Sequence, residues 1–238
     1  MKEALTLILF INIFQLAYSQ THHNAWLRGT VSFPVNKSFR TDFELQYRSQ
    51  NGYGNSRCFD NDLMQSFRFW LKYKLKEGLI LEVSPFAYFI HHQIIIKEAD
   101  QILKPTNEIR PSFAIEQSNA LFSRIQFIQR TALDFRFFSI PNNNLIRFRE
   151  KLALRFELTK LFHFMLYDEI LLNTSNVKAA NLLDHNRLYL GSSIQLYPKL
   201  KIEIGYMKVQ RLLRSTSFVI NENNFVLNIN YSLRKIMN

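Results

Sequence analysis

Few residues of this chain have the types and spacing that catalysis needs. His185, Ser193 and Glu169 fall on one face of neighbouring predicted strands, and a serine activated by a histidine is the arrangement of many hydrolases. His185 and Ser193 lie on the same strand, however, and their separation along it is roughly 26 Å at about 3.3 Å per residue. That distance excludes a direct triad.

His163 is the other candidate base. It is predicted to lie opposite Glu157, a carboxylate that can orient an imidazole, but we expect no serine near it in the hairpin register. Neither the H-x-S nor the G-x-S-x-G pattern occurs in the sequence. A lipid-acting hydrolase of the outer membrane is therefore kept as an alternative function, without a recognisable catalytic motif.

No pattern in the sequence points to a cofactor or a metal ion. Cys58 is the one cysteine, so no disulfide can form within the chain, and it stands in a polar stretch, "NGYGNSRCFDND". The pairs His22-His23 and His91-His92 are adjacent, so on a strand their side chains point to opposite faces. We expect no metal site and no cofactor.

Charged residues form a more regular pattern than the candidate catalytic ones. If tight turns are centred near Asn36, Glu77, Asn119 and Lys160, opposite charges face each other across four hairpins, where such pairs are favourable. The predicted pairs are Arg28 with Glu44, Lys72 with Glu82, Glu108 with Arg130, and Lys151 with Glu169, and Arg147, Arg149, Arg155, Arg187 and Glu203 are expected on the same face.

The elements that must position these charges are strands. Period-two alternation recurs almost to the end of the chain, and short connections alternate with long polar ones, as in an up-and-down outer-membrane barrel with short periplasmic turns and longer outer loops. The eleven predicted strands are 24–34, 39–49, 63–75, 79–91, 106–117, 121–137, 145–157, 162–173, 185–197, 200–210 and 224–234.

Single-chain bacterial barrels have even strand numbers, so eleven is an unexpected result. Either a short strand has been overlooked, for which "STSFVI" at 215–220 is the candidate, or one N-terminal element is not part of the wall. We therefore expect about ten to twelve strands in a single all-β domain that covers residues 20–238.

The two faces of the strands decide between a membrane barrel and a soluble one. In "FRTDFELQYR" at 39–48, Phe43, Leu45 and Tyr47 share one face and Glu44 lies on the other. The apolar face recurs on ten of the eleven predicted strands, and a barrel of about eleven strands is too wide for these side chains to fill. The pattern favours a transmembrane barrel with a charged lumen over a soluble periplasmic lipid-binding barrel or a sandwich.

The composition agrees with this location. The formal net charge is +11, which would suit an anionic partner such as nucleic acid or the phosphates of lipopolysaccharide. Because the basic residues are spread along the whole chain, we expect no nucleic-acid binding. We expect contacts with outer-membrane lipids and lipopolysaccharide, and the sequence leaves a small-molecule ligand unknown.

The first residues resemble a secretory signal peptide. Lys2 precedes an apolar run, "ALTLILFINIFQLA", and Ala17-Tyr18-Ser19 is a small-x-small cleavage pattern. The run is shorter than the about 20 residues that a membrane-spanning helix needs, and it contains Asn12 and Gln15. We therefore predict that residues 1–19 are a signal peptide and that the mature chain is exported to the outer membrane.

Several segments together resemble a known family. Trp26 before a tight turn, "FELQYR", "RFREKLALRFE", "YDEILLN", "HNRLYLGSSIQL" and "KIEIGYM" are similar to the outer-membrane barrel family known as domain of unknown function 2490. The resemblance covers essentially the whole mature chain. It implies the location and the barrel fold, and it carries over no catalytic residues.

One feature departs from barrels generally. Many end on an aromatic residue that the barrel-assembly machinery recognises during insertion, whereas here Tyr231 and Leu233 are followed by "RKIMN". We expect insertion by that machinery nonetheless. The long charged side chains should fill a barrel of ten to twelve strands, so the sequence predicts a structural barrel or a narrow, closed channel with a charge-lined lumen.

Overall fold

Almost all of the described chain is β-strand, as the period-two pattern predicts. The computed structural model describes residues 21–140, 143–178, 181–212 and 219–233. No helix in this part of the chain has the length and apolar character that crossing a membrane would require. The elements are β1 (Thr21–Pro34), β2 (Phe39–Gln50), β3 (Asn61–Lys76), β4 (Leu79–His91), the 3-10 helix η1 (Glu98–Ile102), β5 (Thr106–Ile109), β6 (Ser112–Phe122), β7 (Ile125–Phe138), β8 (Leu145–Glu157), β9 (Phe162–Asn173), β10 (Leu183–Tyr197), β11 (Leu200–Leu212) and β12 (Val219–Ser232).

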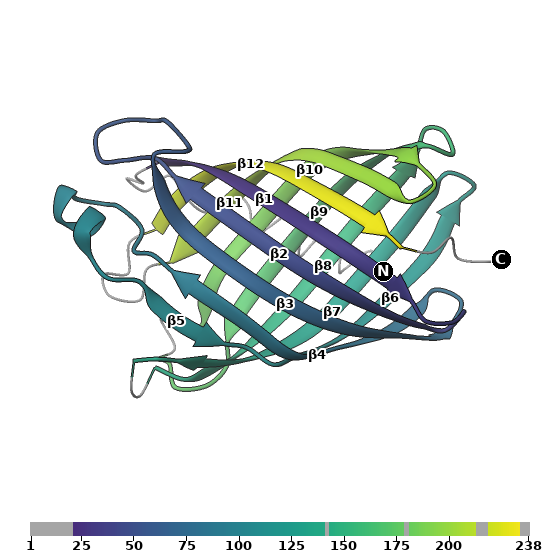
Figure 1. Ribbon diagram of the computed structural model, residues 1–238, viewed down its shortest axis with the longest axis horizontal. Helices are drawn as coiled ribbons and strands as arrows, with labels where there is room; N and C mark the ends of the chain where they lie inside the picture. The colour runs from purple at the N-terminus through teal and green to yellow at the C-terminus, as the bar shows by residue number, and fades with distance from the viewer. Residues whose placement is uncertain (1–20, 141–142, 179–180, 213–218, 234–238) are drawn as a thin grey trace.

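The strands form one closed barrel, and they are tilted around its axis (Figure 1). Sequential neighbours pair in antiparallel fashion, and β1 closes the barrel against β12 in a parallel pair that runs from Thr21 beside Asn221 to Ser32 beside Ser232. When strands alternate in direction, an odd number of them makes the first and last parallel. The parallel closure therefore reflects a wall with eleven positions.

Twelve assigned strands fill these eleven positions because β5 and β6 share one. Both pair with β4 on one side and with β7 on the other. The break falls at Arg110-Pro111, where proline has no N–H to donate to the ladder. The single strand predicted at 106–117 spans this break.

The prediction of an all-β, up-and-down barrel of about ten to twelve strands is confirmed, and the wall has eleven positions, so the general rule of an even number does not hold here. No overlooked strand is needed to close the wall. Of the candidate stretch at 215–220, Val219 and Ile220 belong to β12, and the rest lies outside the described residues. The predicted signal peptide also lies outside them.

The connections between strands differ in length at the two ends of the barrel (Figure 1). At one end the connections are short: Asn36 Oδ1 accepts the N–H groups of Ser38 and Phe39 at 2.8 Å, and Gly78 takes a φ of 72° that side chains disfavour. At the other end the connections are longer and cover 51–60, 92–105, 139–144 and 174–182. We call these the turn end and the loop end.

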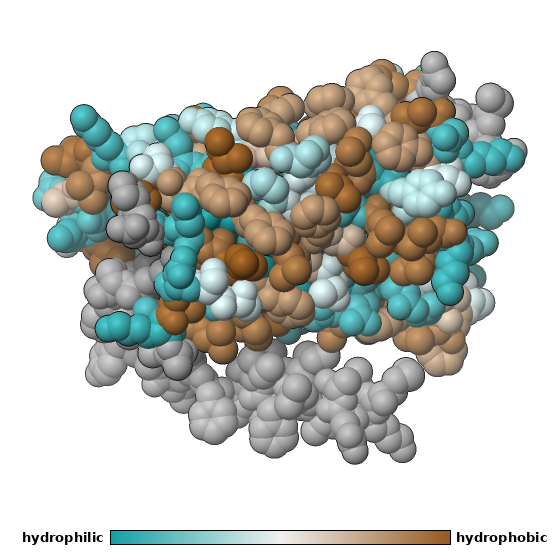
Figure 2. Space-filling model, turned by 90° about the horizontal axis from the view of Figure 1, so that it is seen from below, coloured by the Kyte–Doolittle hydropathy of each residue, from teal (hydrophilic) through white to brown (hydrophobic). Residues whose placement is uncertain are grey.

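The outer wall is apolar between the two ends. Leu45 is 64% exposed, and most other outward side chains on the strands are aliphatic or aromatic. Figure 2 shows hydrophobic residues over the middle of the visible wall, with hydrophilic ones gathered toward the ends. A large contiguous apolar surface of this kind marks a wall that meets an apolar partner rather than water.

Two kinds of exception to the alternation have structural reasons. Strict alternation along β4 would place Phe86 on the lumen face with Glu82, but an irregular register with β3 between Phe69 and Leu71 turns it outward, where its ring lies 6.5 Å from that of Phe67. Glu150, a charge on the outer wall, accepts hydrogen bonds from two of its neighbours, Gln129 at 2.7 Å and Thr131 at 2.6 Å. Polar groups on this face therefore pair with each other.

The interior is packed by large side chains as well as charged ones. Tyr189 lies over Gly191 and Gly205, at each of which a Cβ atom would collide with its ring. Its ring stacks on that of Tyr167 with 4.6 Å between centroids. Tyr189 also packs in a buried cluster with Trp26, Met207, Val209 and Val226. This cluster fills one side of the barrel.

Candidate functional site

The lumen is the candidate site, because the inward half of the alternation gathers nearly all the charge-bearing strand residues there. Two cavities remain between these side chains, one of about 310 Å³ and one of about 250 Å³ nearer the loop end. Both are polar. Four arginines line both of them and therefore mark their boundary: Arg48, Arg110, Arg147 and Arg187.

Two of the predicted charge pairs have the expected register. Lys72 lies directly opposite Glu82, and its Nζ is 3.0 Å from a carboxylate oxygen of Glu82. Lys151 lies directly opposite Glu169, but its ion-pair contact is with Glu116 at 4.0 Å. The residues of both pairs therefore face each other in the register, but only the side chains of Lys72 and Glu82 are in contact.

Arg28 and Glu44 come together in a different way. The first hairpin is shifted by two residues from the predicted register, so Arg28 lies opposite Gln46, and Glu44 lies opposite Thr30. The even shift keeps both charges on the lumen face, and their side chains meet diagonally at 3.7 Å.

The predicted pairing of Glu108 with Arg130 is wrong. The third hairpin turns at residues 123–124 rather than near Asn119, so Arg130 lies opposite Glu116. An even shift of register leaves the faces unchanged, and the alternation alone does not distinguish the two turn positions. Arg130 instead reaches across to Glu82, with an Nη2 to oxygen distance of 2.6 Å.

Glu108 is the centre of a buried network at the break between β5 and β6. Its side chain is fully buried and accepts hydrogen bonds from the guanidinium groups of Arg110 and Arg136, the latter at 2.8 and 2.9 Å. The His91 ring nitrogen Nε2 lies 2.7 Å away. Three neighbours around one carboxylate satisfy its oxygens and tie β4, β5 and β7 together.

The further predicted lumen arginines are also held by buried carboxylates. Arg147 donates to Asp134 at 2.7 Å and to Asp184 at 3.1 Å. Arg149 and Arg187 share the two oxygens of Glu169, at 2.5 and 2.8 Å. Sequence reasoning missed Asp134 and Asp184 as partners, although each stands at an inward position of its strand.

Glu203 and Arg155 lie on the lumen face with different surroundings. Glu203 accepts hydrogen bonds from the Tyr189 hydroxyl at 2.7 Å and from Asn228 at 3.0 Å. Arg155 is half-buried near the turn end, and no ion pair joins it to a described residue. The sequence predicted no partner for either residue.

Aromatic rings in the lumen are the feature that sequence reasoning did not find. The Arg48 guanidinium lies 3.2 Å from the centroid of the Trp26 ring. The Arg68 guanidinium lies 4.8 Å from Trp70 and 5.2 Å from Phe89. Each of these arginines is therefore stabilised by a ring face.

The row of His163, Glu157 and Ser193 differs from what the sequence indicated. His163 is opposite Glu157, as predicted, but Ser193 of β10 is also directly opposite His163, where no serine was expected. No hydrogen bond joins the three side chains in the described part of the chain. The row lies on the lumen face of the wall, opposite to its apolar outer face.

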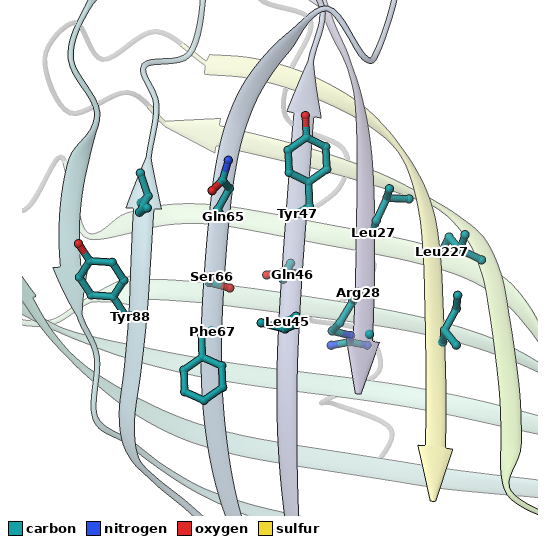
Figure 3. A pocket seen from close by; sticks show the side chains of 13 residues that line it. Leu27, Arg28, Leu45, Gln46, Tyr47, Gln65, Ser66, Phe67, Tyr88 and Leu227 are labelled. Carbon is teal, nitrogen blue, oxygen red and sulfur yellow. The ribbon is translucent and has the colours of Figure 1, made fainter. Parts of the chain in front are cut away.

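A separate hollow of about 630 Å³ lies on the outer wall around Gly29, whose missing side chain leaves room there. Figure 3 shows Leu27, Leu45, Phe67 and Tyr88 at this hollow. Most of the lining surface is apolar, so the hollow is part of the apolar wall rather than of the lumen.

The profile of a family described as a protein of unknown function, DUF2490, matches residues 23–217. The chain belongs to the DUF2490 family. The match includes β2 to β11 and most of β1, so the resemblance inferred from short segments is confirmed. No curated protein matches this DUF2490 chain.

Among solved structures, the DUF2490 barrel is similar to one described as a NanC porin in a rhombohedral crystal form. The TM-score is 0.51 at 10% sequence identity, and the alignment covers 89% of this chain and 99% of that one. At so low an identity the likeness concerns the fold alone, which is a porin-like β-barrel.

Proposed function

We propose that this DUF2490 protein is an outer-membrane barrel whose lumen is kept narrow and closed by ion-paired side chains. The observation that carries the proposal is the inversion of the usual soluble pattern: apolar side chains cover the outside of a closed wall, and charged ones fill the inside. The porin-like fold supports the same location. Residues 1–19 would then serve as the signal peptide for export.

The proposal assigns partners to the apolar wall and to the basic residues beyond it. The apolar wall would contact outer-membrane lipids, and basic residues beyond it would contact the phosphates of lipopolysaccharide. Insertion would require the barrel-assembly machinery.

Cell fractionation combined with heat-dependent gel mobility tests the location. We expect the chain in the outer-membrane fraction, and we expect its migration to change on boiling, because a closed barrel stays folded in detergent until it is heated. A chain recovered as soluble periplasmic protein, with the same migration before and after boiling, would contradict the proposal.

A further inference from the structure

The loop-end half of the lumen carries more positive charge than its carboxylates balance. Nine arginines lie there against six carboxylates that contact them within 4.0 Å, an excess of three among the described residues. Including Glu203, which bonds Tyr189 and Asn228, still leaves an excess of two. The arginines are Arg28, Arg48, Arg68, Arg110, Arg136, Arg147, Arg149, Arg187 and Arg211, and the carboxylates are Glu44, Glu108, Asp134, Glu169, Asp184 and Glu222.

Two of these arginines have no carboxylate partner in the described part of the chain. Arg68 is 6% exposed, and its Nε and Nη2 have no hydrogen-bond acceptor. Glu44 lies opposite Arg68 in the register, but its side chain contacts Arg28. Arg48 donates one long hydrogen bond to Gln46, at 3.3 Å, and its Nε has no acceptor. Unsatisfied buried donors of this kind are rare and call for an explanation.

Aromatic rings hold these arginines without neutralising them. Trp26 lies beneath Arg48 and Arg187, whereas Phe89 lies between Arg68 and Arg110, with distances of 5.2 and 3.7 Å to its centroid. A ring face stabilises a guanidinium charge but does not accept the in-plane N–H groups, which stay free to donate to oxygen atoms. The arrangement presents donors to the cavities.

We propose that the loop-end half of the lumen is a binding site for a small soluble anion with carboxylate or phosphate oxygens, held by Arg48 and Arg68. Guanidinium groups recognise these oxygens in bidentate fashion. Of the two cavities, the one of about 310 Å³ is lined by both arginines, and it has the volume of about ten water molecules at about 30 Å³ per molecule, enough for a small solute. The wall separates them from the outer surface, so a lipid headgroup with its acyl chains is excluded.

This inference rests on the proposed function, because the anion would reach the site through the barrel lumen. Its test measures binding rather than conduction. The chain has two tryptophans, Trp26 and Trp70, and both lie against these arginines. We expect saturable changes in the tryptophan fluorescence of the folded barrel in detergent when inorganic phosphate or citrate is added at low ionic strength. A response to one probe alone supports the site and narrows its chemistry to that oxygen group.

Matched variants locate the site. Arg68→Met and Arg48→Met should each weaken binding about tenfold or more, because each removes a charged hydrogen-bond donor to the anion. Arg155→Met removes a lumen arginine near the turn end and should leave the affinity unchanged. Isothermal titration calorimetry measures all three, and heat-dependent gel mobility checks that each variant is folded.

Three results would overturn the inference: no saturable response of the folded wild-type barrel to either probe, the same response to potassium chloride at matched ionic strength, or equal weakening by Arg155→Met. If the variants fail to fold, the titration of the wild-type barrel still tests the inference. A folded barrel that binds neither anion but fractionates with the outer membrane contradicts this inference alone. A barrel that binds but is soluble in the periplasm contradicts the proposed location alone.

Discussion

Leu45→Arg is expected to destabilise the folded barrel by about 2–4 kcal/mol in lipid vesicles. Leu45 lies near the middle of β2, it is 64% exposed, and it points away from the lumen. In lipid, an arginine at this depth loses its hydration and finds no carboxylate partner on the apolar wall. Urea unfolding of the variant and the wild type, each folded into vesicles, measures the difference in the free energy of unfolding.

Val35→Arg is the matched control for this substitution. Val35 lies in the turn between β1 and β2 and is 56% exposed, so an arginine there meets water and should cost about 0–1 kcal/mol. If Leu45→Arg cost no more than Val35→Arg, the wall would face water, as in a soluble periplasmic barrel, and the membrane account would be wrong.

Glu108→Gln is expected to lower the free energy of unfolding by about 3–5 kcal/mol. The substitution keeps the shape of the side chain but removes the charge that Arg110 and Arg136 share. Both guanidinium groups are more than nine-tenths buried, so they would stay charged: Arg110 would lose its carboxylate contact among the described residues, and Arg136 would keep Asp184 at 3.9 Å. The loss should appear as a lower urea midpoint and as a lower temperature for the change in gel mobility.

Glu77→Gln provides the control, because Glu77 is exposed in the turn between β3 and β4. Its effect should be within about 0.5 kcal/mol. The double substitution Glu108→Gln with Arg110→Met should recover part of the lost stability, since it removes one of the unbalanced charges. An effect of Glu108→Gln as small as that of Glu77→Gln would show that the buried network contributes nothing to stability.

Alternation in the sequence was sufficient to predict the fold and the faces of the strands. Phe43 and Leu45 point outward and Glu44 inward as predicted, because a side-chain period of two leaves only one assignment once either face is known. The strand number was also predictable. The general rule of even numbers argued against it, since that rule does not foresee a closing pair that runs parallel, as β1 and β12 do.

Individual contacts in the lumen were less predictable. Two hairpins kept the predicted register: Gly78 fixes the turn that sets Lys72 opposite Glu82, and Lys151 lies opposite Glu169. The third hairpin lacks glycine, and its turn lies farther along the chain than predicted, which separated Glu108 from Arg130.

Contacts across the lumen depend on curvature rather than on sequence order. Asp184 of β10 reaches Arg147 of β8 although β9 lies between these strands. Trp26 meets Arg187, which is distant in the chain and not on a neighbouring strand. No hairpin register encodes such neighbours, and the unpaired arginines therefore emerge only from the folded barrel.

The conductance of the purified barrel in a planar lipid bilayer tests the closed lumen most directly. The structure predicts no stable conductance, or a very small one, because ion pairs such as Lys72 with Glu82 and the packed Tyr189 cluster leave only separate cavities. A large, stable conductance of the wild-type protein would contradict this account, because the ion-paired side chains would then have to lie clear of an open pore.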